Sequence, residues 1–179
     1  MTQQPPENNT HQTSNKIGKS FIWISWVIGL ILLVFVFQDM LDEQWNPNEQ
    51  PQYQLTDSGK AEVRLQQNRQ GHYVTQGKIN GYDVIFLLDT GATNVSIPSH
   101  IAEQLNLKSF GSHIAQTANG SVRVYQTKLD QLNIGNLFLH DVSASINPGM
   151  QSNEILLGMS ALKKVEFSQS GKQLILRER

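Results

Sequence analysis

The chain of 179 residues contains no cysteine. This absence excludes thiol nucleophiles, thiolate-bound zinc and disulfide bonds, so a folded domain must be stabilised by core packing or by oligomerisation. The sequence also lacks a basic cluster, and its formal net charge is −1. Proteins that bind nucleic acid carry clustered Lys and Arg, and we therefore expect no nucleic-acid partner. With 39% apolar residues, the chain fits one modest globular domain with appendages.

Charge is absent from Phe21 to Phe37, a run of seventeen mostly large apolar residues. As a helix the run covers about 26 Å, close to the roughly 30 Å hydrocarbon core of a bilayer. A core helix of a soluble domain is a poor alternative because the run has no polar face. A cleaved signal peptide is the other alternative, but no small-x-small cleavage site follows the run. We therefore predict a transmembrane signal anchor over residues 21–38.

The charges that flank this run predict its orientation. Lys16 and Lys19 precede the run, and no further Lys or Arg occurs until Lys60. The positive-inside rule then places the N-terminus in the cytoplasm and the rest of the chain on the other side of the membrane.

Composition divides the remainder of the chain. Residues 1–20 are polar and aperiodic and are expected to form a disordered cytoplasmic tail. Residues 39–70 are again polar, with few hydrophobic side chains, and are expected to be a linker. Val63 and Leu65 could belong to a short strand or helix within this segment. Residues 71–179 are expected to form one folded domain, large enough for its own core.

The pattern of residues 71–179 indicates an all-β domain with one or two short helices. Asn80-Gly81 is a strong hairpin signal, and Tyr82 to Leu88 is expected to be its second strand. Val84 to Leu88 within this strand is apolar on both faces, which predicts a central position in a sheet. A short helix is expected over Ile101–Leu105, with Ser99 as its N-terminal cap.

Asp89-Thr90-Gly91 follows this apolar strand directly, and Ala92-Thr93 comes next. A carboxylate at the end of a buried strand is costly to desolvate, and proton chemistry on a substrate would explain its position. The triplet alone also fits an Asp that stabilises a turn. Two further motifs follow downstream, and they are Thr117-Ala118-Asn119-Gly120 and Leu156-Leu157-Gly158-Met159-Ser160.

In this order the three motifs resemble those of the retropepsin-like aspartic proteases, and most closely those of a bacterial, membrane-anchored group within clan AA. The resemblance covers roughly residues 71–179. It implies a single-lobe acid-protease barrel that works as a homodimer, because each lobe supplies one catalytic Asp. The substrate would be a polypeptide, with no metal or organic cofactor required. A bacterial inner-membrane location, with the protease domain in the periplasm, follows from the resemblance together with the predicted anchor.

The resemblance also implies roles for individual residues. Asp89 would be catalytic, and two copies of it, one from each chain, would activate a water molecule and polarise the scissile carbonyl. The residues that support the active-site loop would be Thr90, Gly91, Ala92 and Thr93. The tip of a flap over the substrate would be formed by Thr117, Ala118, Asn119 and Gly120. Packing against the catalytic loop would come from Leu156, Leu157 and Gly158.

The chain departs from the retroviral members at two positions. Those proteins carry an Asp where this chain has Thr93 and an Arg where it has Met159, and the resemblance implies that these two residues pair. Losing both leaves no unpaired charge. The retroviral mode of dimer stabilisation is therefore not expected here, and confinement of two lobes to a membrane could compensate by raising their effective concentration.

The sequence allows four other interpretations. Asp57-Ser58-Gly59 resembles a second catalytic triplet, but it lacks a buried strand before it and is expected to be a surface turn. Ser160 lies in a partial nucleophile elbow, where Leu162 replaces the required Gly. The five His residues show no metal-binding spacing, so no metal site is expected. The last alternative is a binding module that keeps the fold without cutting its ligand.

Overall fold

A computed structural model describes residues 14–117 and 120–179 of the chain. The chain divides into two compact units, residues 1–41 and residues 42–179. Helix α1 (Ser14–Trp45) contains the segment Phe21–Gln38, whose mean hydropathy is 2.4 and whose side chains are all exposed. A helix that is apolar on every side has no face for water, and this one is long and apolar enough to cross a membrane.

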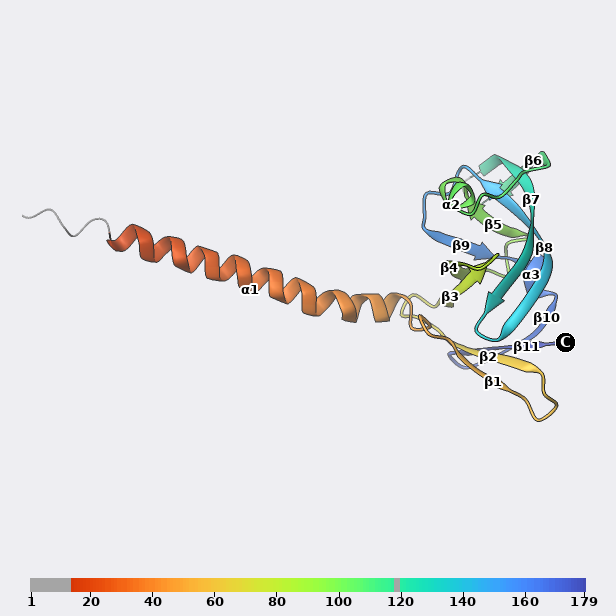
Figure 1. Cartoon of the computed structure of the whole chain (residues 1–179), viewed down its shortest axis with the longest axis horizontal. Helices are drawn as coiled ribbons and strands as arrows, with labels where there is room; N and C mark the ends of the chain where they lie inside the picture. The colour runs from red at the N-terminus through yellow and green to blue at the C-terminus, as the bar shows by residue number, and fades with distance from the viewer. Residues whose placement is uncertain (1–13, 118–119) are drawn as a thin grey trace, which may run out of the picture. The chain divides into compact units, whose positions relative to one another are not determined.

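The second unit is mostly strand, with two short helices (Figure 1). Its strands are β1 (Gln52–Leu55), β2 (Ala61–Gln66), β3 (Val74–Ile79), β4 (Tyr82–Leu88), β5 (Val95–Pro98), β6 (Gly111–Thr117), β7 (Gly120–Ile134), β8 (Leu137–Asn147), β9 (Glu154–Leu157), β10 (Val165–Ser170) and β11 (Gln173–Glu178). Its helices are α2 (Ser99–Gln104) and α3 (Met159–Leu162). The predicted all-β class with short helices is confirmed.

The larger sheet has the strand order β3-β4-β9-β5-β8-β7-β6. An additional pairing of β3 with β7 closes this sheet into a barrel made of β3, β4, β9, β5, β8 and β7, and β6 projects from it. Strand β4 lies between β3 and β9, which confirms the central position expected from its apolar sequence. The barrel interior is filled by fully buried side chains that include Phe86, Ile97, Leu129 and Ile155.

The hairpin between β3 and β4 forms as predicted at Asn80-Gly81. Both residues have positive φ, 49° and 88°, as a two-residue type I′ turn requires. The predicted cap of α2 is wrong, because α2 begins at Ser99 itself, and no side chain caps its first turn. Pro98 occupies the cap position, where its restricted φ already suits the start of a helix.

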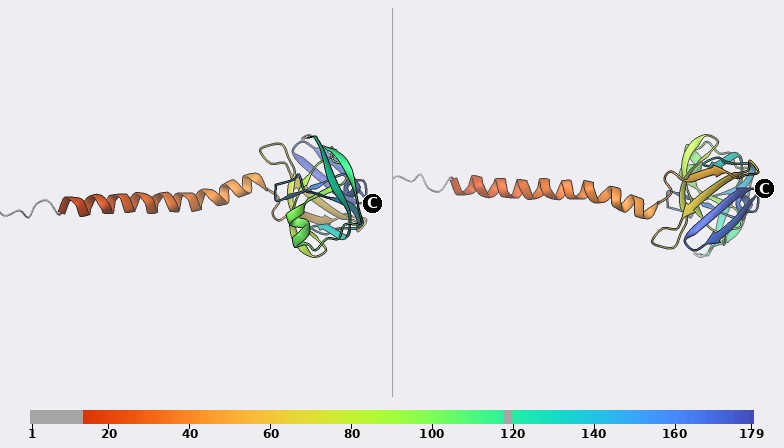
Figure 2. Two further views of the ribbon diagram at one scale, coloured as in Figure 1. Left: turned by 90° about the horizontal axis from the view of Figure 1, so that it is seen from above. Right: turned by 90° about the horizontal axis from the view of Figure 1, so that it is seen from below.

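The expected linker over residues 39–70 is also wrong, because much of this segment belongs to the folded unit. Strands β1 and β2 form a four-stranded antiparallel sheet with β11 and β10, in the order β1-β2-β11-β10. Figure 2 shows the two hairpins of this sheet, gold and blue, side by side in its right-hand view. Val63 and Leu65 are fully buried in the same core as the barrel residues. The alternation of Ala61, Val63 and Leu65 is the strand signal that the polar composition concealed.

Asn48 fixes the start of this unit to the barrel. Its side-chain amide donates to the carbonyls of Val74 (2.7 Å) and Gln66 (2.9 Å), and its Oδ1 accepts from the Gln66 N–H (2.6 Å). Asn48 is 3% exposed, so these bonds satisfy a polar side chain that water does not reach. The folded domain therefore begins well before residue 71.

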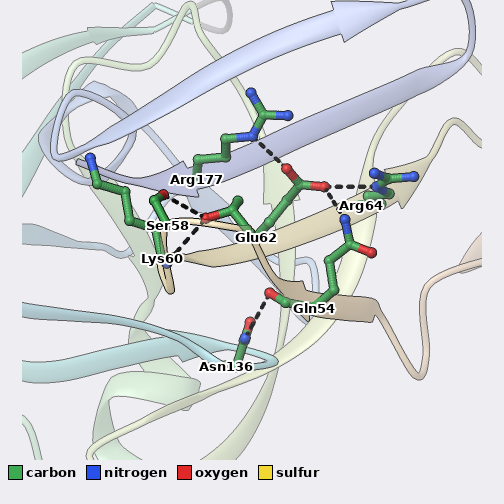
Figure 3. A network of polar contacts seen from close by, with 8 residues as sticks. Gln54, Ser58, Lys60, Glu62, Arg64, Asn136 and Arg177 are labelled. Atoms are coloured by element: carbon green, nitrogen blue, oxygen red, sulfur yellow. Dashed lines mark hydrogen bonds and ion pairs between the residues drawn. The ribbon is translucent and has the colours of Figure 1, made fainter.

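Glu62 lies on the face of the small sheet opposite the core, and it is 1% exposed (Figure 3). Its carboxylate accepts from Arg177, which lies opposite it on β11, and from Arg64 at 2.8 Å. Gln54, opposite it on β1, donates a third bond at 2.9 Å. The hydrogen bonds from Arg177 and Arg64 lower the pKa of Glu62 below its usual value.

Glu62→Gln is expected to lower the free energy of unfolding by about 1.5–3 kcal/mol at pH 7, because charge-assisted hydrogen bonds are lost. Since the folded-state pKa is depressed, the contribution of the carboxylate is complete above the unfolded pKa of about 4.3 and disappears as pH falls through the folded pKa. Urea unfolding at several pH values, followed by circular dichroism, should show wild type and variant converging below that range. A constant difference at all pH values would contradict this role.

Asp141→Asn is the matched control. Asp141 pairs with Lys128 at 2.7 Å, and this partner lowers its pKa too, but the pair is exposed to solvent. Exposed pairs contribute little to stability, so we expect this variant to unfold as the wild type does.

Candidate active site

Strand β4 carries Asp89 to the edge of the barrel core. The strand ends at Leu88, and the Asp89 N–H donates to the carbonyl of Leu157 at 3.2 Å, which continues the parallel pairing of β4 with β9. Asp89 is half-buried, while Thr90 and Gly91 are exposed. The carboxylate therefore sits on a short loop whose first residue is still held by the sheet.

The Asp89 side chain organises its own loop. Its Oδ1 accepts from the Gly91 N–H at 2.8 Å, and its carbonyl accepts from the Ala92 N–H at 3.2 Å. This is an Asx-type turn, in which a side chain replaces a backbone acceptor. Gly91 is not among the glycines with positive φ, and a Cβ there would lie 3.1 Å from Asp89 Oδ1. The small size of Gly91 thus matters more than its conformational freedom.

Gly158 allows the closest approach in this region. A Cβ at this position would lie 2.3 Å from the Asn94 carbonyl oxygen and 2.7 Å from that of Ala92, and both are backbone atoms. The φ of Gly158 is −87°, which other residues adopt readily, so space and not backbone conformation requires the glycine. Leu157 before it is fully buried and Leu156 is half-buried.

Backbone hydrogen bonds join the loop after Asp89 to the start of α3. The Met159 N–H donates to Ala92 O at 2.8 Å, and the Ser160 N–H donates to Thr93 O at 2.9 Å. The two positions at which the chain departs from retroviral members, Thr93 and Met159, are therefore close neighbours. The structure brings the Asp89 motif and the Leu-Leu-Gly motif together as one unit.

Ser160 has a bonding pattern that sequence reasoning missed. Its hydroxyl donates to the Ser143 carbonyl at 2.7 Å and accepts from the Val95 N–H at 2.9 Å. The hydroxyl thus ties α3 to β8 and β5. Only a structure could reveal this, because the three residues are far apart in the sequence.

Ser160→Ala is expected to lower the free energy of unfolding by about 1 kcal/mol, since it removes both hydrogen bonds of the hydroxyl. Any polypeptide cleavage measured for the wild type should be retained by this variant, because the hydroxyl is engaged with backbone groups. Urea unfolding and a peptide-cleavage assay of the full chain would check both outcomes. Loss of cleavage with unchanged stability would instead favour a serine hydrolase.

The third motif lies at the end of the β6–β7 hairpin. Thr117 pairs with Gly120, and its Oγ1 donates to the Gly120 carbonyl at 2.8 Å. Gly120 has a φ of 104°, which favours glycine. Ala118 and Asn119 lie outside the described residues. Most side chains of β6 are exposed, so the hairpin is an arm that extends from the barrel.

A cavity of about 310 Å³ lies beside Asp89. Asp89 and Thr90 line it together with Tyr73, Phe167 and Gln169, among others, whereas Thr117 and Gly120 do not. Tyr73 is buried, burial raises the pKa of its hydroxyl, and within the described residues that hydroxyl has no hydrogen-bond partner. Phe167 and Gln169 lie on β10, far from Asp89 along the chain, and no motif in the sequence marks them or Tyr73.

The other sequence candidates are placed away from this loop. Asp57-Ser58-Gly59 forms the exposed turn between β1 and β2, which confirms the surface turn expected for it. Within residues 14–117 and 120–179, no group of three or more His, Asp or Glu side chains could hold a metal ion.

Comparison with known proteins gives two informative relatives. An uncharacterised protein in the cobV 5′ region of Sinorhizobium sp. is 32% identical over 119 residues, which are 64% of this chain and 51% of that protein. The chain therefore spans about half the length of this relative. The crystal structure of a retropepsin-like aspartic protease from Rickettsia conorii matches 71% of this chain and 95% of its own, with a TM-score of 0.54 and 22% identity. This second likeness concerns the fold.

A more distant match is the EIAV protease complexed with the inhibitor HBY-793, with a TM-score of 0.46 and 17% identity over 54% of this chain and 89% of that one. The family model of the gag-polyprotein putative aspartyl protease matches residues 75–164, just over half of the chain. This segment contains Asp89, the hairpin arm and the Leu-Leu-Gly motif. On this match the chain belongs to the gag-polyprotein aspartyl protease family, and its fold is retropepsin-like, as its three motifs predict.

Proposed function

We propose that the chain is an aspartic endopeptidase that hydrolyses peptide bonds as a symmetric homodimer, with one Asp89 from each copy. The observation that carries this proposal is the position of Asp89 in an aspartyl protease family member. Asp89 follows a central strand, stands on a loop packed against Gly158, and lines a cavity. The chain offers no second triplet of this kind, because Asp57 lies in an exposed turn. In the proposed enzyme a second copy supplies the other carboxylate.

In the proposed reaction the two Asp89 side chains have different protonation states. Two carboxylates about 3 Å apart cannot both be ionised, and the pair therefore holds one shared proton. The ionised carboxylate takes a proton from a bound water molecule, and the water oxygen bonds to the scissile carbonyl carbon. The protonated carboxyl donates to the carbonyl oxygen. The C–N bond then breaks as a proton passes to the leaving nitrogen.

The neighbouring residues would keep this geometry. Thr90, exposed next to Asp89, would bond across to the loop of the second copy, and Gly91 leaves room for the Asp89 Oδ1. The hairpin arm ending at Thr117 and Gly120 would fold over the substrate and exclude water. No group in this scheme requires a metal or an organic cofactor.

We further propose that the segment 21–38 anchors the protease in a bacterial inner membrane, with the N-terminus in the cytoplasm and the protease domain in the periplasm. The support is the length and hydropathy of Phe21–Gln38 and the Lys residues that precede it. Membrane confinement would raise the effective concentration of the lobes. This would favour a dimer that lacks the retroviral pair at Thr93 and Met159.

Mixing active and inactive chains tests the need for two copies. The full chain is placed in detergent micelles with an unfolded polypeptide, because a fragment starting at residue 71 would lose the core strand β2. A roughly threefold excess of Asp89→Asn chain should lower the cleavage rate per wild-type chain about fourfold, since random pairing then leaves few homodimers of wild type. An unchanged rate would show that one copy suffices. Complete absence of cleavage by wild type would favour the binding module instead.

A further inference from the structure

The connection between the apolar segment and the folded unit is short. Residues 39–45 alone join the end of Phe21–Gln38 to Asn46, which is 8% exposed in the folded unit. Fully extended, these seven residues reach at most about 25 Å, and as the helix that α1 forms up to Trp45 they rise about 10 Å. This limit is covalent and holds for every orientation of the two units. A membrane that holds the segment therefore also holds the start of the folded unit close to its surface.

Asn68 ties the start of the folded unit to a short loop, residues 68–72. Its side-chain amide donates to the Trp45 carbonyl at 3.0 Å, and its Oδ1 accepts from the N–H groups of Gln70 (3.0 Å) and His72 (2.9 Å). Asn68 is 8% exposed, so these bonds satisfy a side chain that water barely reaches. One amide group thus lies between the point where the chain enters the unit and the loop that carries His72.

The same loop borders the candidate active site. His72 and the following residue, Tyr73, line the cavity of about 310 Å³ together with Asp89. The Tyr73 carbonyl accepts from the N–H of Leu88 at 3.0 Å, and Leu88 directly precedes Asp89 in the sequence. The chain therefore enters the folded unit, at Trp45, on the side of the unit that holds the Asp89 loop.

We propose that the substrate is a polypeptide segment that emerges directly from the same membrane, namely the juxtamembrane part of another membrane-anchored protein. This inference rests on the proposed function, since it needs both the endopeptidase and the anchor. A domain of this size has a radius of gyration of about 14 Å, so a connection of at most about 25 Å is shorter than the domain is wide. The side that carries Trp45 and Asp89 consequently stays near the membrane. Confinement also raises the effective concentration of a membrane-bound substrate.

Two model substrates separate reach from confinement. Each has one transmembrane helix and the same unfolded, cleavable segment. The segment follows the helix directly in the near substrate, and in the far substrate it follows a spacer of about 60 residues of EAAAK repeats, which rises about 90 Å where it is helical. Each substrate is reconstituted with the full chain in phosphatidylcholine vesicles. Both substrates are confined equally, so the short reach of the enzyme should make cleavage of the near substrate at least about tenfold faster.

Lengthening the connection tests the same limit in the enzyme. A flexible Gly/Ser insertion of about 40 residues between Gln38 and Asp39 adds a mean end-to-end distance of about 35 Å. The ratio of near to far cleavage should then fall at least about threefold, because the far segment comes within reach. The same insertion between Ser58 and Gly59, in the exposed turn between β1 and β2, is the control and should leave the ratio unchanged.

A fluorescent label tests proximity to the membrane without cleavage. The chain lacks cysteine, so Gln70→Cys provides a single labelling site, and Gln70 is exposed in the loop that borders the cavity. The substitution keeps the bond from the backbone N–H of this residue to Asn68. Energy transfer to lipids labelled at the headgroup should be strong with the native connection and should fall at least about twofold after the insertion at Gln38. The insertion at Ser58 should leave the transfer unchanged.

The outcomes separate this inference from the proposed function. Equal cleavage of the near and far substrates, or energy transfer that the insertion after Gln38 leaves unchanged, would overturn the membrane-proximal substrate even if Asp89 proves catalytic. Faster cleavage of the near substrate that disappears with the longer connection would support it. A chain that cuts neither substrate nor a soluble unfolded polypeptide would overturn the endopeptidase, and the substrate class with it.

Discussion

Asp89→Asn is expected to reduce peptide-bond hydrolysis by a factor of at least about 10² to 10⁴, which is the usual contribution of a general acid or base. The amide cannot take a proton from water, yet its size and its Oδ1 acceptor for the Gly91 N–H are preserved. The loop should therefore keep its shape while the chemistry stops. Initial rates on an unfolded polypeptide, with products identified by mass spectrometry, measure the effect.

Asp57→Asn is the matched control for this substitution. It makes the same chemical change in a triplet of similar sequence, but in the exposed turn between β1 and β2. Its cleavage rate should equal that of the wild type. If Asp89→Asn retained wild-type cleavage, or if both variants lost it equally, Asp89 would not be the catalytic residue.

Gly158→Ala is expected to lower the free energy of unfolding by about 3 kcal/mol or more, because the added methyl group meets backbone oxygens that cannot rotate away. A Cβ would lie 2.3 Å from Asn94 O and 2.7 Å from Ala92 O. Relief would require the loop after Asp89 to move. Since a shift of about 1 Å in a catalytic group can cost about 10²-fold in rate, cleavage should fall even where the chain remains folded.

Gly59→Ala separates this clash from the general effect of adding a methyl group to a glycine. Gly59 has a φ of 77°, but nothing lies within 4 Å of a Cβ built there. The free energy of unfolding should therefore fall only by the conformational cost of about 1–2 kcal/mol. The cleavage rate should be unchanged. Urea unfolding and cleavage assays of both variants provide the comparison. Equal losses in the two variants would contradict a specific packing role for Gly158.

Local signals in the sequence predicted much of the barrel. Asn80-Gly81 predicted a turn that needs two left-handed residues, and both have positive φ. The apolar run Val84–Leu88 predicted a central strand, because a strand that contacts neighbours on both faces has no polar face. Such signals predict structure correctly where the interacting residues are only a few positions apart along the chain.

The small sheet was missed for a corresponding reason. Strands β1 and β2 are short and polar, and β2 is stabilised by β11, more than one hundred residues away in the sequence. Glu62 illustrates this. Its charge alone predicts an exposed side chain, but in the structure it is buried and bonded to Arg177 and Arg64. The unit consequently begins near residue 42, although composition suggested a linker up to residue 70.

The sequence by itself determined the family and the candidate catalytic residue, because Asp89 and its flanking motifs are contiguous patterns. Only the tertiary structure decided why Gly158 must be small, how Ser160 joins three elements, and which strand edge lies beside Asp89. These properties depend on contacts between segments that are distant along the chain. Their free energies arise from packing and hydrogen bonds that exist only after the barrel has closed and β10 and β11 have joined β2.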